Sequence, residues 1–335
     1  MKKKIRLLAI ETSCDETAAA VVENGRRVIS SEVYSQIEHA KFGGVVPEVA
    51  SRSHTVKINS VAAAAVKAAD MEFKDIDGVA VTYGAGLMGA LLVGVTYAKT
   101  LAYSLNKPLI AVNHIQGHIA ANYINYPHLK PPFVCLVISG GHTALLKAED
   151  YTKFAVITET PDDAAGEAFD KIARVLGLPY PGGPNLEKLA KEGTICIEFP
   201  APITKDGRFS FSGLKTAVIN YVNKFNQKKE EFNKADVAAS FQNAVVSSVA
   251  AKCASVCKDA GIKKLCVAGG VAANSALREK IEQEAKKNGL ELFIPEFKYC
   301  TDNAAMIGAQ GYYNYIAGKL AGFDLDVAPS LGIED

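Results

Sequence analysis

The chain has 335 residues, of which 49% are hydrophobic and 22% are charged, as is typical of a globular protein large enough for two lobes. Its formal net charge of +1 excludes an overall field that would attract nucleic acid or a membrane, so a polyanion site must come from local clustering. Seven cysteines, with no Cys-x-x-Cys pair and no signal peptide, indicate buried thiols in a reducing cytoplasm.

The first half of the chain predicts a three-strand meander followed by alternating helices and strands. Strands are expected at 5–11, 17–23 and 27–33, then a helix at 52–69, a strand at 78–82, a helix at 87–105 and a strand at 109–112. Asn24-Gly25 is typical of a type I′ hairpin turn. Residues 78–98 carry no charge, but several glycines interrupt them, which favours a strand, a loop and a helix over a membrane span.

The second half of the chain repeats this order. Strands are expected at 133–139, 143–148 and 154–159, helices at 163–177, 213–225 and 234–260, and then a strand at 264–268, a helix at 274–288, a strand at 290–294 and a helix at 303–318. The repetition predicts two related α/β lobes, residues 1–112 with about 303–335, and residues 113–302. Ligands of such sheets bind near strand ends, so the site is expected in the cleft between the lobes, mostly on the second.

Two of the six histidines lie four residues apart in Asn113-His114-Ile115-Gln116-Gly117-His118, directly after an apolar run. One helical turn would stack both imidazoles on one face, where they could share a metal ion. Asn113 is expected to cap this helix, whose positive end would keep His114 neutral and able to coordinate. A capped helix with two half-exposed histidines and no metal is the alternative.

Asp302 precedes the last predicted helix and offers a third ligand. Its alternative role is that of a helix cap or a first-turn acid. Two histidines and a carboxylate suit Fe(II) or Zn(II) and leave coordination positions open. No glutamate follows His114, so the His-Glu-x-x-His pattern of metalloproteases is absent.

Polar and glycine-rich loops follow several predicted strands. Thr12-Ser13-Cys14-Asp15-Glu16-Thr17 and Ser139-Gly140-Gly141-His142-Thr143 occupy equivalent places in the two halves. Missing side chains let backbone N–H groups approach phosphate oxygens, although tight hairpins also need glycine. Gly269-Gly270-Val271-Ala272-Ala273-Asn274 opens a helix, where Asn274 either binds a base or ribose or caps the helix.

Two further features have less specific interpretations. Asp170 lies in the middle of a predicted helix, where it either reaches ribose hydroxyls or lies on the surface. Gly84-Ala85-Gly86-Leu87-Met88-Gly89 matches a dinucleotide-binding fingerprint, but Asn113 stands where its acidic partner should be. We therefore expect these glycines to allow close packing of a helix on the sheet.

Together these motifs resemble the TsaD/Kae/Gcp family of tRNA threonylcarbamoyladenosine transferases, in its bacterial form. The resemblance spans nearly the whole chain in family order. It rests on Glu11-Thr12-Ser13-Cys14-Asp15-Glu16-Thr17, Asn113-His114-Ile115-Gln116-Gly117-His118, Ser139-Gly140-Gly141-His142-Thr143, Asp163-Ala164-Ala165-Gly166-Glu167-Ala168-Phe169-Asp170-Lys171, Pro181-Gly182-Gly183-Pro184, Phe209-Ser210-Phe211-Ser212-Gly213-Leu214-Lys215, Gly269-Gly270-Val271-Ala272-Ala273-Asn274 and Thr301-Asp302-Asn303.

The resemblance implies an actin/Hsp70-like α/β fold of two RNase H-like lobes with a nucleotide and metal site between them. It implies transfer of a threonylcarbamoyl group from threonylcarbamoyl-AMP to N6 of adenosine 37 in tRNAs reading codons that begin with A, with release of AMP. His114, His118 and Asp302 match the ligands of one divalent metal ion. The nucleotide positions, which ATP or ADP could also occupy, match Val137, Ile138, Ser139, Gly140, Gly141, Asp170, Gly183 and Asn274, with Glu187 at a variable position.

The resemblance also implies partners, namely tRNA, a TsaB-like paralogue and a TsaE-like ATPase, and no membrane. Asp15 and Glu16 are candidate catalytic residues that could position water, metal or nucleophile, or be ordinary turn carboxylates. Two other functions stay open at this point. One is a metalloendopeptidase that uses the histidine pair, and the other is an ATP-binding scaffold or sugar-kinase-like protein.

Overall fold

The computed structural model describes residues 4–334, which form two compact units. The first unit contains the described residues up to Pro131, together with Ala148–Ala155 and the described residues from Pro295 onward. The second unit contains Pro132–Lys147 and Val156–Ile294. This division differs from the expected lobe boundaries, because helix α3 (His114–Asn125) packs against helix α9 (Ala304–Ile316) and so belongs to the first unit.

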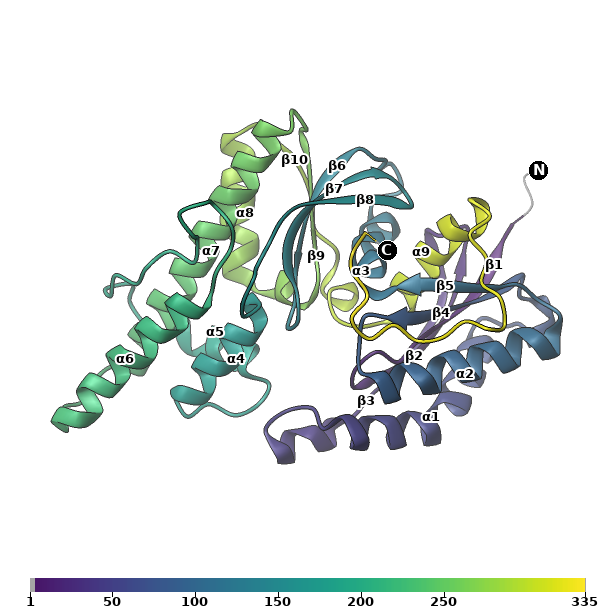
Figure 1. Cartoon of the computed structure of the whole chain (residues 1–335), viewed down its shortest axis with the longest axis horizontal. Coiled ribbons are helices and arrows are strands. Elements are labelled where there is room, and N and C mark those ends of the chain that lie inside the picture. Colours follow the sequence, from purple (N-terminus) through teal and green to yellow (C-terminus); the bar gives the residue numbers. More distant parts are fainter. Residues whose placement is uncertain (1–3, 335) are drawn as a thin grey trace. The chain divides into compact units, whose positions relative to one another are not determined.

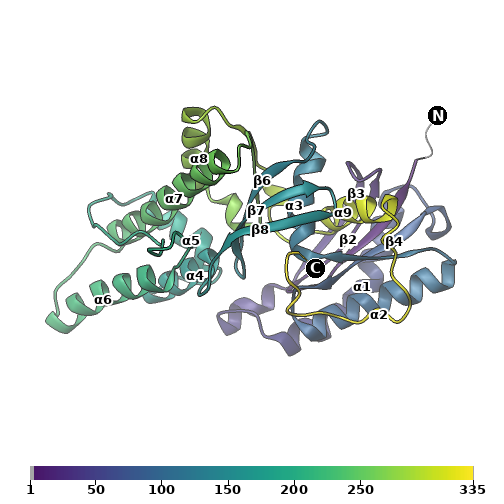
Figure 2. The same cartoon turned by 45° about the horizontal axis from the view of Figure 1, so that its top comes forward.

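The first unit is built on a five-stranded sheet in the order β3-β2-β1-β4-β5 (Figures 1 and 2). Strand β1 is antiparallel to β2 and parallel to β4. The turn between β2 and β3 has the two positive φ angles of a type I′ hairpin, 52° at Asn24 and 67° at Gly25, as predicted. The strands are β1 (Arg6–Glu11), β2 (Glu16–Glu23), β3 (Arg27–Ser35), β4 (Gly78–Gly84) and β5 (Leu109–Asn113).

Helices cover both faces of this sheet (Figures 1 and 2). Leu8 and Ile10 point into a core with α1 (Pro47–Ala68) and α2 (Met88–Leu105), while Leu7 and Ala9 point into a core with α3 and α9. Alternate residues of a strand face opposite sides, which explains why this central strand is apolar from Leu7 to Ile10. Short 3₁₀ helices lie at η1 (Ile37–Phe42), η2 (Phe73–Asp75) and η4 (Phe297–Tyr299).

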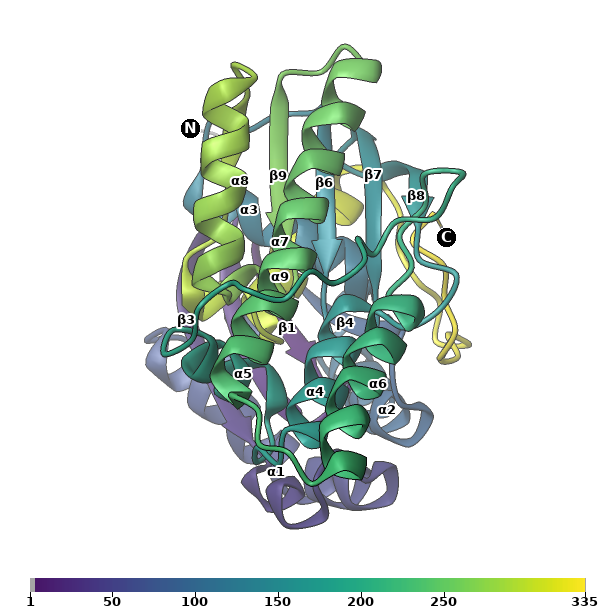
Figure 3. The same ribbon diagram turned by 90° about the vertical axis from the view of Figure 1, so that its left-hand side faces the viewer.

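The second unit repeats the sheet of the first. Its strand order, β10-β9-β6-β7-β8, matches β5-β4-β1-β2-β3 strand for strand, which confirms the predicted duplication. Helices α7 and α8 cover one face of this sheet (Figure 3). The strands are β6 (Phe133–Ile138), β7 (Thr143–Asp150), β8 (Lys153–Glu159), β9 (Lys264–Ala268) and β10 (Glu291–Phe293), and the helices are α4 (Ala165–Val175), α5 (Gly182–Ala190), α6 (Ser212–Lys228), α7 (Lys234–Asp259), η3 (Gly270–Ala273) and α8 (Ser275–Lys287).

Two helices differ from the sequence prediction. Helix α1 begins at Pro47 rather than near residue 52, because proline is well tolerated in the first helical turn, where its missing N–H costs no hydrogen bond. Helix α5 was not predicted, since its start in Gly182-Gly183-Pro184 has the composition of a turn. Among residues 4–334, no helix combines the length and the apolar character needed to cross a membrane.

The C-terminal segment is tied to the first unit by a series of hydrogen bonds. The N–H of Ala328 donates to the carbonyl of Tyr83 at 2.8 Å. Asn113 Nδ2 donates to the carbonyl of Gly332 at 2.7 Å, and Gln116 Nε2 donates to that of Ile333 at 3.0 Å. This segment, residues 328–333, therefore lies along the end of β4 and the start of α3, and we call it the C-terminal strap.

The fit of α9 on the sheet gives a test of the packing. A Cβ added at Gly308 would lie 2.5 Å from Val22 Cγ2 and 2.8 Å from its Cβ, which are rigid positions on β2. We expect Gly308→Ala to lower the free energy of unfolding by about 1–2 kcal/mol, because overpacking outweighs the gain in helix propensity. Thermal or urea unfolding measures the loss.

Gly213→Ala in α6 is the matched control, since a Cβ there meets open space. It should leave the stability unchanged or raise it slightly. Equal unfolding midpoints for the two variants would contradict the packing.

Candidate functional site

The histidine pair lies at the start of α3, which follows β5 without a loop. Asn113 caps this helix as predicted, with its Oδ1 accepting the N–H of Ile115 at 2.9 Å. The spacing of four residues brings the two rings together, with centroids 4.7 Å apart and planes at 82°. His118 is buried and His114 nearly so.

Asp302 reaches both histidines from the segment just before α9. Its Oδ1 lies 3.1 Å from His118 Nε2 and 3.5 Å from His114 Nε2. The cap of α9 is Asn303, whose Oδ1 accepts the N–H of Met306, so Asp302 is not needed for capping. The structure thus brings together all three predicted ligands, and it does so within the first unit alone.

The geometry of this group fits a divalent transition metal. One ligand atom from each of the three residues lies within 4.8 Å of the others. Ligands about 2.1 Å from a tetrahedral zinc ion are about 3.4 Å apart, close to the two distances from Asp302 Oδ1 to the imidazole Nε2 atoms, 3.1 and 3.5 Å. Two imidazoles and a carboxylate also suit Fe(II).

Sequence reasoning did not assign a role to Glu11, which lies behind His114. Its Oε2 is 3.1 Å from His114 Nδ1 and accepts the hydroxyl of Thr82 at 2.6 Å, while its Oε1 accepts the N–H of Ser13. Glu11 is fully buried. The available signal was a single acid at the end of the apolar run Leu7-Leu8-Ala9-Ile10.

Electrostatic interactions in this group favour charged side chains. Burial alone would lower the pKa of His114, but the charges of Asp302 and Glu11 outweigh it and raise this pKa well above 6.5. Burial alone would raise the pKa values of Asp302 and Glu11, and the charge of His114 lowers both. Without metal, His114 is therefore an imidazolium between two carboxylates, contrary to the neutral ring expected from the helix end.

Glu16, the first residue of β2, lies near this group, and Asp15 precedes it in the loop from β1 to β2. Burial, followed by the charges of Asp302 and Asp15, raises the pKa of Glu16 to about 9. The loop is held by the N–H of Gln36, which donates to the carbonyl of Asp15 at 3.1 Å, and by His54 Nε2, which donates to that of Cys14 at 2.9 Å. The loop that carries Asp15 is thus fixed, and Glu16 lies within electrostatic reach of Asp302.

The predicted nucleotide residues gather in the second unit. The loop after β6 contacts the start of α4, where the N–H of Gly166 donates to the carbonyl of Ser139 at 3.1 Å. A Cβ at Gly166 or Gly269 would collide with the backbone of residues 138–140, whereas one at Gly140 or Gly141 would meet open space. The loop is therefore packed from behind and open at its glycines.

Asp170 and Glu187 hold neighbouring helix starts together. Asp170 Oδ1 accepts the N–H of Gly183 at 3.0 Å, and burial raises the pKa of this carboxyl. Glu187 accepts both the N–H and the hydroxyl of Ser275, the first residue of α8. Helix α5 thereby links α4 to α8.

Three of the predicted nucleotide residues have side chains that are buried or already hydrogen-bonded within the protein. Asn274 caps α8, with its Oδ1 accepting the N–H of Leu277 at 2.9 Å, and its Nδ2 donates to Gln242 Oε1 at 2.8 Å. Val137 and Ile138 are fully buried in β6, so only their backbone is available.

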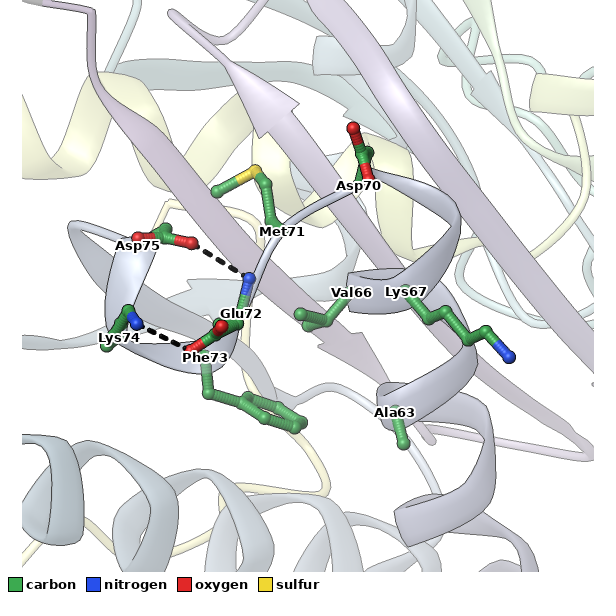
Figure 4. A pocket seen from close by; sticks show the side chains of 9 residues that line it. All are labelled: Ala63, Val66, Lys67, Asp70, Met71, Glu72, Phe73, Lys74 and Asp75. Atoms are coloured by element: carbon green, nitrogen blue, oxygen red, sulfur yellow. Dashed lines mark hydrogen bonds and ion pairs between the residues drawn. The ribbon is translucent and has the colours of Figure 1, made fainter.

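A separate hollow of about 690 Å³ lies at the end of α1 and around η2 (Figure 4). Three of its charged residues bond to one another: Lys74 Nζ lies 2.7 Å from Glu72 Oε2, and Asp75 Oδ2 accepts the N–H of Glu72 at 2.9 Å. None of the predicted site residues lines it. We assign it no role.

Comparison with known structures addresses the fold. HypF from T. kodakarensis matches with a TM-score of 0.66 at 15% identity, over 93% of this chain and 48% of that one. Component A of the Acidaminococcus fermentans (R)-2-hydroxyglutaryl-CoA dehydratase matches with a TM-score of 0.54 at 16% identity, over 93% of this chain and 99% of that one. These likenesses, with the duplicated sheets, confirm the actin/Hsp70-like α/β fold.

Comparison of sequences addresses the family. Residues 27–309 match the TsaD family, described as tRNA N6-adenosine threonylcarbamoyltransferase. Proteins of that name from Clostridium perfringens (strain SM101 / Type A) and Clostridium kluyveri (strain NBRC 12016) are 58% and 56% identical, each covering 99% of this chain and 98% of the relative. The chain therefore belongs to the tRNA N6-adenosine threonylcarbamoyltransferase family.

Proposed function

We propose that the chain transfers the threonylcarbamoyl group of threonylcarbamoyl-AMP to N6 of adenosine 37 in tRNAs that read codons beginning with A. N6 attacks the carbamoyl carbon, the bond from that carbon to the phosphate oxygen breaks, AMP leaves with the electron pair, and N6 loses a proton. Family membership across nearly the whole chain carries this proposal. The metalloendopeptidase and scaffold alternatives are not favoured by it.

The three converging ligands support a cation site of the enzyme. His114 Nε2, His118 Nε2 and an oxygen of Asp302 would hold one divalent ion, Fe(II) or Zn(II), and leave positions open for substrate oxygens. When bound, such an ion acts as a Lewis acid that stabilises negative charge on oxygen. The chain's own contribution is to hold the two histidines on α3 and Asp302 in the segment just before α9, a helix that packs against α3.

The second unit offers a place for the adenylate. The open backbone of Gly140 and Gly141 suits phosphate oxygens, and the side chain of Asp170, held by the N–H of Gly183, suits ribose hydroxyls. Ser139, Glu187, Asn274 and the backbone of Val137 and Ile138 surround this place. ATP or ADP would use the same contacts.

Asp15 and Glu16 complete the proposed catalytic group. At neutral pH and without metal, a Glu16 pKa of about 9 makes its carboxyl a hydrogen-bond donor beside the ligands. A neutral carboxyl can position a substrate oxygen or water, and Asp15 lies next to Glu16 in the chain. We assign both residues to positioning of the reactants.

The partners follow from the family resemblance. Its bacterial members act with a TsaB-like paralogue and a TsaE-like ATPase, and we propose the same partners here. We propose that the chain acts on tRNA in the cytoplasm.

Replacing both proposed histidine ligands tests the metal site. We expect His114→Ala/His118→Ala to reduce transfer to background and to remove the bound metal, because one carboxylate alone cannot hold the ion. Nucleoside mass spectrometry of tRNA incubated with donor and partner proteins measures transfer, and elemental analysis measures metal. His128→Ala, an exposed histidine of the same unit, is the control. Normal modification by the double variant would disprove the metal role.

Metal affinity should depend on pH. The pKa of His114 lies well above 6.5, so near neutral pH a proton occupies the Nε2 that the metal needs. Below that pKa the affinity should fall by about tenfold for each unit of acidification, and binding should release a proton. Competition with a chromophoric chelator between pH 6 and 8 measures this. A flat profile would show that His114 is not a ligand.

Asp170→Asn tests the nucleotide site. Loss of the carboxylate should weaken ADP or AMP binding by about tenfold or more, the effect of losing a hydrogen bond to a charged group. Isothermal titration calorimetry gives the affinity. Asp259→Asn, at an exposed position of the same unit, should bind as the wild type does. Equal affinity for all three proteins would remove Asp170 from the site.

A further inference from the structure

We propose that Glu11 is the positioning residue of the metal site, which holds His114 with its proton on Nδ1 so that the Nε2 lone pair faces Asp302 and the cation. This inference rests on the proposed metal site and adds to it a residue that touches neither metal nor substrate. The evidence for it is the contact of His114 Nδ1 with Glu11, on the side of the ring opposite the Nε2 that faces Asp302.

Glu11 is itself held in place. It ends β1, which pairs with β2 on one side and β4 on the other, so its backbone lies in the middle of the sheet. Both carboxylate oxygens have donors, the N–H of Ser13 for Oε1 and the hydroxyl of Thr82, at 2.6 Å, for Oε2. The side chain is 0% exposed. It therefore has a single orientation in which to meet His114.

The chemistry of the contact determines which ring nitrogen carries the proton. A carboxylate only accepts hydrogen bonds, so the 3.1 Å contact from His114 Nδ1 to Glu11 Oε2 requires a proton on Nδ1. Ser13 Oγ also lies 3.1 Å from Nδ1, but a hydroxyl can donate or accept and does not select a tautomer. When a metal displaces the proton on Nε2, the ring keeps its proton on Nδ1, and the Nε2 lone pair is the one that faces the metal.

The second histidine lacks such a support. Among residues 4–334, His118 Nδ1 is buried and has no hydrogen-bond partner. Its orientation depends on packing within α3 and on the contact with Asp302. The two histidines thus differ in whether a carboxylate contacts Nδ1, and only at His114 does such a contact orient the ring. A partner of this sort typically changes metal affinity by about 10- to 100-fold.

The test uses a graded series at Glu11 and a matched glutamate. Glu11→Gln keeps one oxygen that can accept from Nδ1, and Glu11→Met keeps the length of the side chain but has no oxygen. Glu23→Gln is the control, because Glu23 is also buried in this sheet, on β2, and accepts hydrogen bonds from Arg6 and Arg27 instead of a histidine. Zn(II) affinity and the Co(II) absorption spectrum are measured on each full-length protein without substrate.

We expect Zn(II) affinity to fall by about tenfold in Glu11→Gln and about a hundredfold in Glu11→Met, with an altered Co(II) spectrum, while Glu23→Gln binds as the wild type does. Unchanged affinity in both Glu11 variants, or an equal loss in Glu23→Gln, would overturn the role of Glu11 and leave the metal site intact. A wild-type protein that binds neither ion would overturn the metal site, and this inference with it.

A measurement on the wild type covers the case in which the Glu11 variants do not fold. Long-range ¹H–¹⁵N NMR of the zinc-bound protein, assigned with His114→Gln, reports which nitrogen carries the proton. We expect Nδ1 to be protonated and Nε2 to be the metal-bound nitrogen. Coordination through Nδ1 would exclude the proposed contact with Glu11.

Discussion

Residues 113–118 pass from a buried strand directly into a helix, and the side chain of Asn113 stabilises that change of direction. Because Asn113 both ends β5 and caps α3, the sheet determines where the first turn of the helix begins. Both histidines lie within that turn and the next, so their separation is a property of the helix. The rest of the site is arranged around them, with Glu11 behind and Asp302 in front.

In the second unit, close packing at glycines and carboxylate hydrogen bonds hold the candidate residues in place. Its candidate residues lie in loops and near helix starts that pack closely together. Glycines make this packing possible, because a side chain at Gly166 or Gly269 would collide with the backbone of residues 138–140. Carboxylates then join neighbouring helix starts, Asp170 to α5 and Glu187 to α8. The backbone N–H groups are thereby held in place without a ligand, which would reduce the entropic cost of binding the proposed nucleotide.

Much of this structure could be predicted from sequence where a local pattern determines the outcome. The hairpin at Asn24-Gly25, the cap at Asn113 and the repeated strand order all follow from short-range chemistry. Helix α5 could not be predicted, since its stability comes from contacts with α4 and α7 rather than from its glycine-rich start. The unit boundaries were missed because the packing of α3 on α9 is a long-range contact.

For the candidate site too, local motifs could be recognised in the sequence, whereas long-range contacts could not. The motifs identified His114, His118 and Asp302, and the structure supplied their distances. Glu11 could not be assigned, because a single acid at the end of an apolar strand gives no indication of which ring it faces. The raised pKa of His114 could not be predicted, since the helix end disfavours imidazolium while two carboxylates from distant parts of the chain favour it.

The C-terminal strap connects the end of the described chain to the turn that carries the histidines. The carbonyls of Gly332 and Ile333 accept hydrogen bonds from Asn113 and Gln116, the residues on either side of His114 in that turn. Local opening of the strap would remove both bonds at once, so the strap and the helix start belong to one cooperative unit. Proteolytic cleavage within residues 328–333, or a fusion that pulls on them, would therefore loosen the start of α3 without changing His114, His118 or Asp302.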